Sequence, residues 1–255
     1  MLNHSPLILL ALQSLFLIFL PHSGYCEASK HSYKDVSLTS YSIDLEKHDL
    51  RLFWKDESGK RFGNVGALEN WANKQNSQIT FATNAGIFDS WFAPTGLHIE
   101  NGKTIKPINL DSGWGNFFLK PNGVFQIDAS GAKIVRSEDF KAISDIKLAT
   151  QSGPLLVIDG KLHPAFKENS KNFRIRSGVG VKSNKEIIFA ISNQQIRFYD
   201  FAMFFRQELK CNDALYLDGF ISMMHIPASG RIAKRGSFAG IFAVLKPQNS
   251  ETAAP

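Results

Sequence analysis

The stretch Val36-Ser37-Leu38-Thr39-Ser40-Tyr41-Ser42-Ile43 alternates apolar and polar residues with a period close to two. Because successive side chains of a strand point to opposite faces, this pattern predicts a half-buried β-strand. The apolar segment from Leu50 to Trp54 follows after a short polar interval, and we expect it to pair with the first strand as a hairpin. A β-rich fold is therefore expected.

Turn-forming residues punctuate the chain downstream of this stretch, and each group lies between apolar runs. They are Asn101-Gly102, Pro121-Asn122-Gly123, Asp159-Gly160 and Ser183-Asn184-Lys185. The predicted hairpins pair residues 116–119 with 124–127, residues 155–158 with the segment from 161, and residues 179–181 with 187–191. Further apolar runs at 79–82, 214–217 and 240–245 predict buried strands.

Helical periodicity is confined to a few segments. Val65 to Lys74 has apolar residues on one face, and Phe198 to Leu209 has a stripe of phenylalanines that we expect to pack against a sheet. Many strands with two or three helices predict one mixed, β-rich α+β domain over residues 29–246, with the helices packed on a sheet. The polar residues 247–255 are expected to form a flexible tail.

The first 28 residues have the pattern of a signal peptide. Leu7 to Leu20 is apolar except for Gln13 and Ser14, a length that suits a signal and is short of the roughly 20 residues of a transmembrane helix. Cys26-Glu27-Ala28 suits cleavage after Ala28. No Lys or Arg precedes the apolar run, so an uncleaved N-terminal anchor is the alternative. The domain is expected in the periplasm or outside the cell, at a membrane only if the signal is retained.

The chain is moderately basic, with 29 Lys and Arg against 23 Asp and Glu. Loss of Glu27 with the signal would make this 29 against 22, a net charge of +7, which favours anionic substrates or an anionic envelope. Nucleic acid is not an expected partner, because aromatic residues are not interleaved with the basic clusters. After cleavage Cys211 alone would remain, so neither an intramolecular disulfide nor a zinc-type cysteine spacing is predicted.

Four segments place polar residues beside glycine at the ends of apolar runs, where loops display chemistry. In Thr83-Asn84-Ala85-Gly86-Ile87-Phe88-Asp89, Asn84 could donate to a sugar hydroxyl or a phosphate, and Asp89 could accept or coordinate. In the second segment, Gln151 and Ser152 precede a Gly-Pro turn. The alternative for both segments is that these residues only cap or form turns.

The third segment, Arg174-Ile175-Arg176-Ser177-Gly178, is predicted to be a strand with both arginines on one face. A guanidinium suits bidentate contact with phosphate oxygens, and two solvated surface arginines are the alternative. The fourth segment, Leu217-Asp218-Gly219, puts a carboxylate at a strand tip with Ser222 and His225 shortly after. Nothing in the sequence fixes these three as a Ser-His-Asp triad.

In this order the four segments resemble the phosphodiester glycosidase family, over about Ile79 to Leu245. The matching motifs are Asn84-Ala85-Gly86-Ile87-Phe88, Gln151-Ser152-Gly153-Pro154, Arg176-Ser177-Gly178-Val179-Gly180 and Leu217-Asp218-Gly219. The chain has Ala85-Gly86 where the family usually shows two glycines, and Phe220-Ile221-Ser222 where it often shows a glycine run and a Ser pair. The resemblance therefore leaves the sugar unassigned.

The resemblance implies hydrolysis of a sugar-1-phosphodiester at the anomeric C–O bond, with release of a phosphomonoester. Arg176 is then expected to bind phosphate. Asp218, with Asp89 as second candidate, is expected to support the oxocarbenium ion that develops at the anomeric carbon. The other expected substrate-binding residues are Asn84, Gln151, Ser152, Arg174 and Ser222. No cofactor is required by this scheme, which leaves room for a Ca²⁺ or Mg²⁺ near Asp89 or Asp218.

Two other functions fit the same residues. The chain could be a non-catalytic module that binds envelope glycans or anionic polysaccharide, or a metal-dependent phosphodiesterase that cleaves the P–O bond. The enzyme hypotheses require Asn84, Arg176 and Asp218 to converge on one cleft, whereas scattered exposed positions would contradict catalysis.

Overall fold

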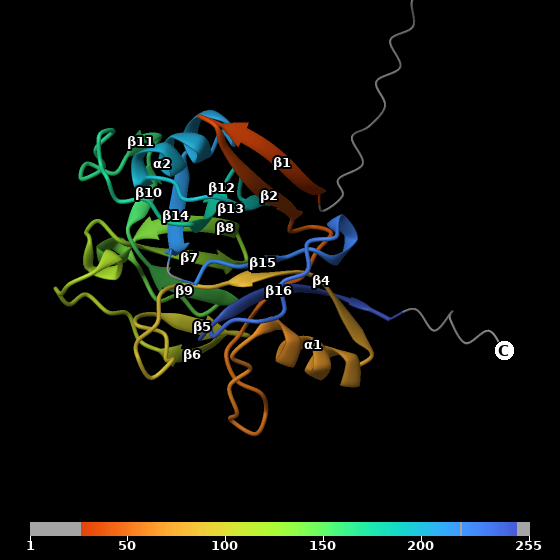
Figure 1. Ribbon diagram of the computed structural model, residues 1–255. Helices are drawn as coiled ribbons and strands as arrows, with labels where there is room; N and C mark the ends of the chain where they lie inside the picture. Colours follow the sequence, from red (N-terminus) through yellow and green to blue (C-terminus); the bar gives the residue numbers. More distant parts are fainter. Residues whose placement is uncertain (1–26, 220, 249–255) are drawn as a thin grey trace, which may run out of the picture.

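The computed structural model describes residues 27–219 and 221–248, and within these ranges the chain forms three antiparallel sheets and two α-helices (Figure 1). A seven-stranded sheet has the order β1 (Glu27–Tyr33), β2 (Val36–Asp44), β13 (Glu186–Ser192), β12 (Ser177–Val181), β14 (Asp213–Asp218), β10 (Leu155–Ile158), β11 (Lys161–Leu162). A four-stranded sheet has the order β15 (Met224–His225), β4 (Ser77–Asn84), β16 (Ile241–Pro247), β3 (Leu50–Phe53). A five-stranded sheet has the order β6 (Lys103–Lys106), β5 (His98–Glu100), β9 (Leu148–Ser152), β7 (Gly123–Asp128), β8 (Gly131–Arg136).

The three sheets meet around a cluster of aromatic rings. Tyr41 of β2 stacks on Phe81 of β4 with ring centroids 4.3 Å apart, and Phe189 of β13 contacts Phe242 of β16 at 5.3 Å. Phe125 of β7 packs edge-on against Phe242 at 5.7 Å. Each ring pair adds about 1 kcal/mol beyond the burial of its area. These five residues join all three sheets into one core.

The two predicted helices are confirmed. α1 (Val65–Lys74) begins where the Asn64 side chain accepts a hydrogen bond from the N–H of Ala67, and it packs on the four-stranded sheet. α2 (Phe198–Gln207) lies against the seven-stranded sheet (Figure 1). Its buried phenylalanines pack with residues of that sheet. Glycine at positions 178 and 180 of the sheet leaves room for the side chains of α2 and of Cys211. A Cβ at Gly180 would lie 2.5 Å from Cys211 Sγ, so these glycines make room for the helix side and not for a ligand.

The expected pairing of Val36–Ile43 with Leu50–Trp54 is wrong. β2 lies between β1 and β13, whereas β3 pairs with β16. The alternation also changes phase within β2, because Leu38 faces α2 while Tyr41 and Ile43 face the central core. β2 is therefore buried on both faces and not half-buried.

Another predicted strand is absent from the described part of the chain. Asn116–Phe118 forms a 3₁₀ helix, and β7 pairs with β8. The hairpins at Asn101-Gly102, Asp159-Gly160 and Ser183-Asn184-Lys185 are confirmed. At the first two turns both residues have positive φ, the conformation that Asn-Gly and Asp-Gly tolerate well.

Residues 1–26, which hold most of the predicted signal peptide, lie outside the described residues. Its last two residues, Glu27 and Ala28, are the first of β1, where Ala28 pairs with Tyr41. No helix in residues 27–219 or 221–248 is long and apolar enough to cross a membrane. Of the residues predicted as a tail, Pro247 is the last residue of β16 and the Gln248 N–H donates to the Asn76 carbonyl. Residues 249–255 lie outside the described part.

Candidate active site

A cavity of about 400 Å³ brings together the two aspartates that the sequence singled out. Asp89 lies on the loop after β4, and Asp218 is the last residue of β14. The volume of the cavity is within the range of small-molecule sites. Its lining residues are Ile87, Phe88, Asp89, Ser90, Phe92, Asn116, Asp218 and Ile221.

Asp218 is held at the cavity by the loop that follows it. Its Oδ1 accepts hydrogen bonds from the N–H groups of Gly219 and Ile221, the second at 3.4 Å. Glycine is required at 219, since a Cβ there would lie 1.8 Å from the Tyr216 hydroxyl oxygen. The carboxylate is half-buried and oriented by backbone donors at a strand end.

Asp89 caps a turn and also lines the cavity. Its Oδ1 accepts hydrogen bonds from the N–H groups of Trp91 and Ala93, both at 2.9 Å, which closes the turn. The carboxylate is also exposed and lines the cavity. The turn-capping interpretation is therefore confirmed, and it leaves Asp89 in position to contact a bound molecule.

Asn84 and Ser222 are fastened beneath the loop of Asp218. Asn84 is buried, with Oδ1 accepting from the N–H of Met223 at 3.0 Å and Nδ2 donating to Ser177 Oγ at 3.0 Å. Ser177 Oγ is also 3.3 Å from the Asp218 carbonyl oxygen. Ser222 Oγ donates to that same carbonyl at 2.7 Å. These side chains hold the backbone from the Asp218 carbonyl to Met223, and neither Asn84 nor Ser222 lines the cavity.

Ser152 ties together the two segments that carry the aspartates. Its side chain is fully buried, and Oγ accepts from the N–H of Ile87 at 3.2 Å and donates to the carbonyl of Leu217 at 3.1 Å. Ile87 precedes Asp89 by two residues, and Leu217 precedes Asp218. One hydroxyl thus fixes the spacing of both chain segments.

Gln151 is buried and connects neighbouring loops by hydrogen bonds. Its Oε1 accepts from the N–H groups of Leu97 at 3.0 Å and Asn109 at 2.9 Å. Its Nε2 donates to the Asn109 carbonyl at 2.6 Å and to Ser137 Oγ at 2.9 Å. Both polar atoms of the amide bond protein groups, so in this arrangement Gln151 positions loops and does not face the cavity.

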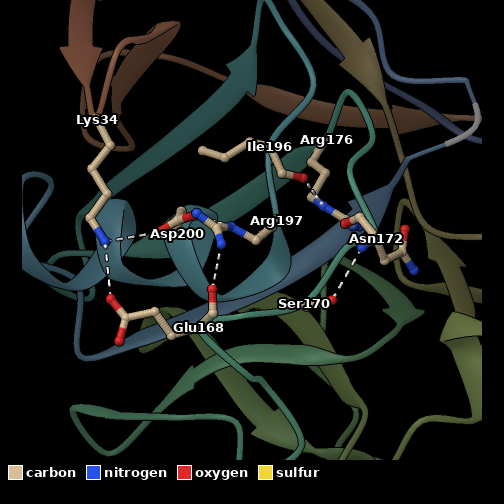
Figure 2. Close-up of polar contacts among 8 residues, drawn as sticks. All are labelled: Lys34, Glu168, Ser170, Asn172, Arg176, Ile196, Arg197 and Asp200. Atoms are coloured by element: carbon tan, nitrogen blue, oxygen red, sulfur yellow. Dashed lines mark hydrogen bonds and ion pairs between the residues drawn. The ribbon is translucent and has the colours of Figure 1, made fainter.

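Arg176 is almost fully buried, and Figure 2 shows its side chain beside Ile196 and Asn172. Nε donates to the Ile196 carbonyl at 2.9 Å and Nη2 to the Asn172 carbonyl at 3.0 Å. The guanidinium lies 3.5 Å from the centroid of the Phe198 ring, and Nη1 is 3.5 Å from the Tyr216 hydroxyl oxygen. Burial lowers the pKa of the Arg176 guanidinium. The ion pairs found among the described residues do not include Arg176.

The prediction that Arg174 and Arg176 share one strand face is wrong. β12 begins only at Ser177, and Arg174 is exposed with Nη1 donating to its neighbour's carbonyl at Phe173. The segment before Arg176 is instead fixed by α2, since Arg197 Nη1 donates to the carbonyl of Glu168 (Figure 2). The two arginines therefore occupy different environments, one solvated and one buried.

Sequence reasoning missed Asn116 and Arg61. Asn116 lines the cavity from a 3₁₀ helix that was predicted as a strand, and it lies close to the buried Tyr216 hydroxyl. Burial raises the pKa of Tyr216, while Arg176 and Asn116 act in the opposite direction. The exposed Arg61 guanidinium lies 4.5 Å from the Phe92 ring centroid, and Phe92 lines the cavity. Neither residue has a sequence signal beyond its type.

The enzyme hypotheses require Asn84, Arg176 and Asp218 to converge on one cleft, and of the three only Asp218 lines the cavity. Asn84 is linked to the backbone of Asp218 through Ser177, and Arg176 contacts Tyr216, two residues before Asp218. Within the described residues, no group of three His, Cys, Asp or Glu side chains is gathered closely enough to hold a metal ion.

Most glycoside hydrolases use two carboxylates beside the scissile bond, and here two carboxylates line one cavity. Comparison of the sequence with known families is consistent with this class. Residues 77–238 match the profile of the phosphodiester glycosidase family, and the chain belongs to that family.

The chain is 35% identical over 209 residues to the uncharacterized protein YigE of Escherichia coli (strain K12), with 82% of each chain covered. Among solved structures, the pro-peptide-inhibited catalytic domain of zebrafish N-acetylglucosamine-1-phosphodiester alpha-N-acetylglucosaminidase superposes with a TM-score of 0.60 at 14% identity, covering 86% of this chain and 81% of that chain. A Burkholderia pseudomallei K96243 protein whose name describes it as exported superposes with a TM-score of 0.52 at 10% identity, covering 82% and 74%. At these identities the two structures support the fold.

Proposed function

We propose that this chain is an exported hydrolase that cleaves the glycosidic C–O bond of a sugar-1-phosphodiester in the cavity between Asp89 and Asp218. The observation that carries the proposal is the position of both carboxylates on one cavity wall in a member of the phosphodiester glycosidase family. Export is supported by the apolar N-terminal segment and by the name of the Burkholderia relative.

The chemistry needs little more than these groups. As the bond between C1 and the phosphate oxygen breaks, both bonding electrons leave with the oxygen and positive charge develops on the sugar. A carboxylate beside C1 stabilises that charge or takes a proton from the attacking water. The phosphomonoester is a good leaving group, so it needs less protonation than an alkoxide would. We assign the position beside C1 to Asp218 because backbone N–H groups orient it, and the second carboxylate position to Asp89.

In this scheme Arg176 acts on the cavity through its charge, without lining it. Nε and Nη2 each donate to a carbonyl oxygen, and Arg176 does not line the cavity, so we assign it no direct contact with the phosphate. A buried positive charge is screened less than an exposed one, and it makes the adjoining cavity more favourable for an anion. Arg61 and Arg174, which are exposed, are the candidates for closer contact with the phosphate.

The test is a screen of the purified protein against sugar-1-phosphodiesters that differ in the sugar, with release of reducing sugar as the readout. The Asp218→Asn protein is the control for contaminating hydrolases. Release of sugar and phosphomonoester by the wild type, and not by the variant, would support the proposal. Equal release by both proteins, or release of no sugar from any diester, would contradict it.

A further inference from the structure

Exposed apolar side chains gather around the cavity. Among the described residues eight large apolar side chains are exposed, and five of them lie on three loops that border this site. These five are Trp91, Leu110, Trp114, Phe173 and Ile175. Such a concentration on a protein surface marks a binding surface more often than scattered single residues do.

The two tryptophans are the most exposed of the group. The Trp91 residue is 85% exposed and the Trp114 residue 98% exposed. Trp91 lies between Ser90 and Phe92, which both line the cavity, and Trp114 precedes the cavity residue Asn116 by two positions. Both indoles are therefore attached to the wall of the candidate active site.

The loops that carry these indoles are held by specific bonds. The N–H of Trp91 is bonded to Asp89, and a bridge between Phe88 and Pro94 closes the same loop. The second loop is clasped by Gln151 at Asn109. The indoles are thus presented on backbone that is fixed by the polar layer below it.

Glycine on both sides of Trp114 produces its exposure. A Cβ at Gly113 would lie 2.8 Å from the Phe118 ring, so the chain packs closely there. Gly115 has φ +96°, a conformation that L side chains rarely adopt. The backbone therefore turns sharply around Trp114 and directs it away from the core.

We propose that Trp91 and Trp114 bind sugar rings of a glycan chain that extends beyond the cleaved bond, so that the substrate class is an oligomeric glycosyl phosphodiester. This inference rests on the proposed function for the position of the cleaved bond. An indole has a flat apolar face that matches the C–H face of a pyranose ring, and its N–H remains free for a hydroxyl group. Neither tryptophan is among the residues that line the cavity, so the indoles are available to units of a longer chain outside it.

The charge at the rim fits an anionic chain. Arg61 stacks on Phe92 beside one indole, and Arg174 is exposed next to Ile175, whose carbonyl is 3.5 Å from Ser222 Oγ. The chain as a whole carries a net charge of +6. Cations on the same loops or beside the same aromatic residues suit sugar units joined by phosphodiesters better than a neutral polysaccharide.

The test measures binding and not turnover, on full-length Asp218→Asn protein with the Trp pair intact or changed to Trp91→Ala/Trp114→Ala. The ligands are a synthetic oligomer of four or more sugars joined by phosphodiesters, a single sugar-1-phosphodiester, and phosphatidylglycerol vesicles. Ile143→Ala is the matched control. Ile143 is an exposed apolar residue that precedes the first residue of β9, whereas Ser152, beneath the cavity, is the last residue of that strand.

We expect the oligomer to bind at least about tenfold more tightly than the single diester, and the double Trp variant to lose that preference, while Ile143→Ala keeps it. Equal affinity of the parent and the double variant for the oligomer would overturn the inference. Vesicle binding that depends on the Trp pair, without preference for the oligomer, would overturn it in favour of a membrane surface. Because the Asp218→Asn protein is used, this result stands apart from success or failure of the hydrolysis assay.

Discussion

The polar layer beneath the cavity and the wall of the cavity have opposite chemistry. Beneath it, Asn84, Gln151 and Ser152 are almost fully buried and bond mainly to backbone groups of the loops above them. On the wall, Asp89 and Asp218 use one oxygen for backbone N–H groups and face the cavity. The difference indicates that one set of polar residues fixes the loops, while the other faces the cavity in which we propose that substrate binds.

The largest expected effect is on the wall. Asp218→Asn should lower kcat/KM by at least about a thousandfold, equivalent to about 4 kcal/mol of transition-state stabilisation, because the amide carries no negative charge for the anomeric centre. Its Oδ1 still accepts from Gly219, so the free energy of unfolding should change by less than about 1 kcal/mol. Steady-state kinetics and thermal melting check both. Asp89→Asn should lose less activity than Asp218→Asn. If either variant failed to fold, the aspartate concerned would be needed for the fold and would not be a residue that acts only at the cavity wall.

Arg176 tests the boundary between the two regions. Arg176→Met should lower the free energy of unfolding by about 3 kcal/mol, since the carbonyls of Ile196 and Asn172 lose buried donors. Denaturant titration measures this, and Arg174→Met is the control, expected to change stability by less than about 0.5 kcal/mol because its side chain is exposed.

The same Arg176→Met protein has a kinetic readout. The loss of the buried charge should lower kcat/KM for a charged diester about tenfold more than for a neutral aryl glycoside of the same sugar. An equal loss for both substrates would mean that Arg176 is structural only.

The polar layer should respond in stability and loop motion. Gln151→Leu should cost about 2 kcal/mol and Ser152→Ala about 1 kcal/mol, because the amide makes four hydrogen bonds and the hydroxyl two. Hydrogen exchange should show faster exchange at Leu97 and Asn109 in the Gln151 variant and at Ile87 in the Ser152 variant. Unchanged exchange at these amides would contradict the loop-fastening role.

The smallest effect expected is a pH dependence of stability away from both regions. Burial lowers the pKa of His163 and of His225, so each binds a proton more readily when unfolded. Stability from the neutral rings is therefore present above the unfolded pKa of about 6.5 and is lost as the pH falls below it. Tm should decrease between pH 7.5 and 5.5, and His225→Gln should flatten that decrease. If Tm of His225→Gln depended on pH in the same way as Tm of the parent, the loss of stability at low pH would come from other groups.

The sequence predicted most elements because their signals are local. α1 and α2 follow from periodicity, and the Asp159-Gly160 turn follows from residues that accept positive φ. Partners of distant strands were not predictable in this way, since β3 pairs with β16 across nearly the whole chain. A period of two also cannot show that both faces of a strand are buried, which is why β2 was misjudged.

For the site, sequence reasoning identified residues better than it identified their roles. Asp89 and Asp218 were predicted and do share a cavity. Gln151 and Ser152 were predicted as substrate contacts, but whether a polar side chain faces a cavity or bonds to a neighbouring loop depends on tertiary packing. Asn116 gave no signal because its segment was predicted as a strand.

The most direct test of the central claim is hydrolysis of a cleavable sugar-1-phosphodiester in ¹⁸O-labelled water by the wild-type protein. Cleavage of the C–O bond at the wall formed by Asp89 and Asp218 predicts that the label enters the sugar at C1 and that the phosphomonoester keeps only unlabelled oxygen. Label in the phosphate would show that the P–O bond is broken, and it would contradict the account.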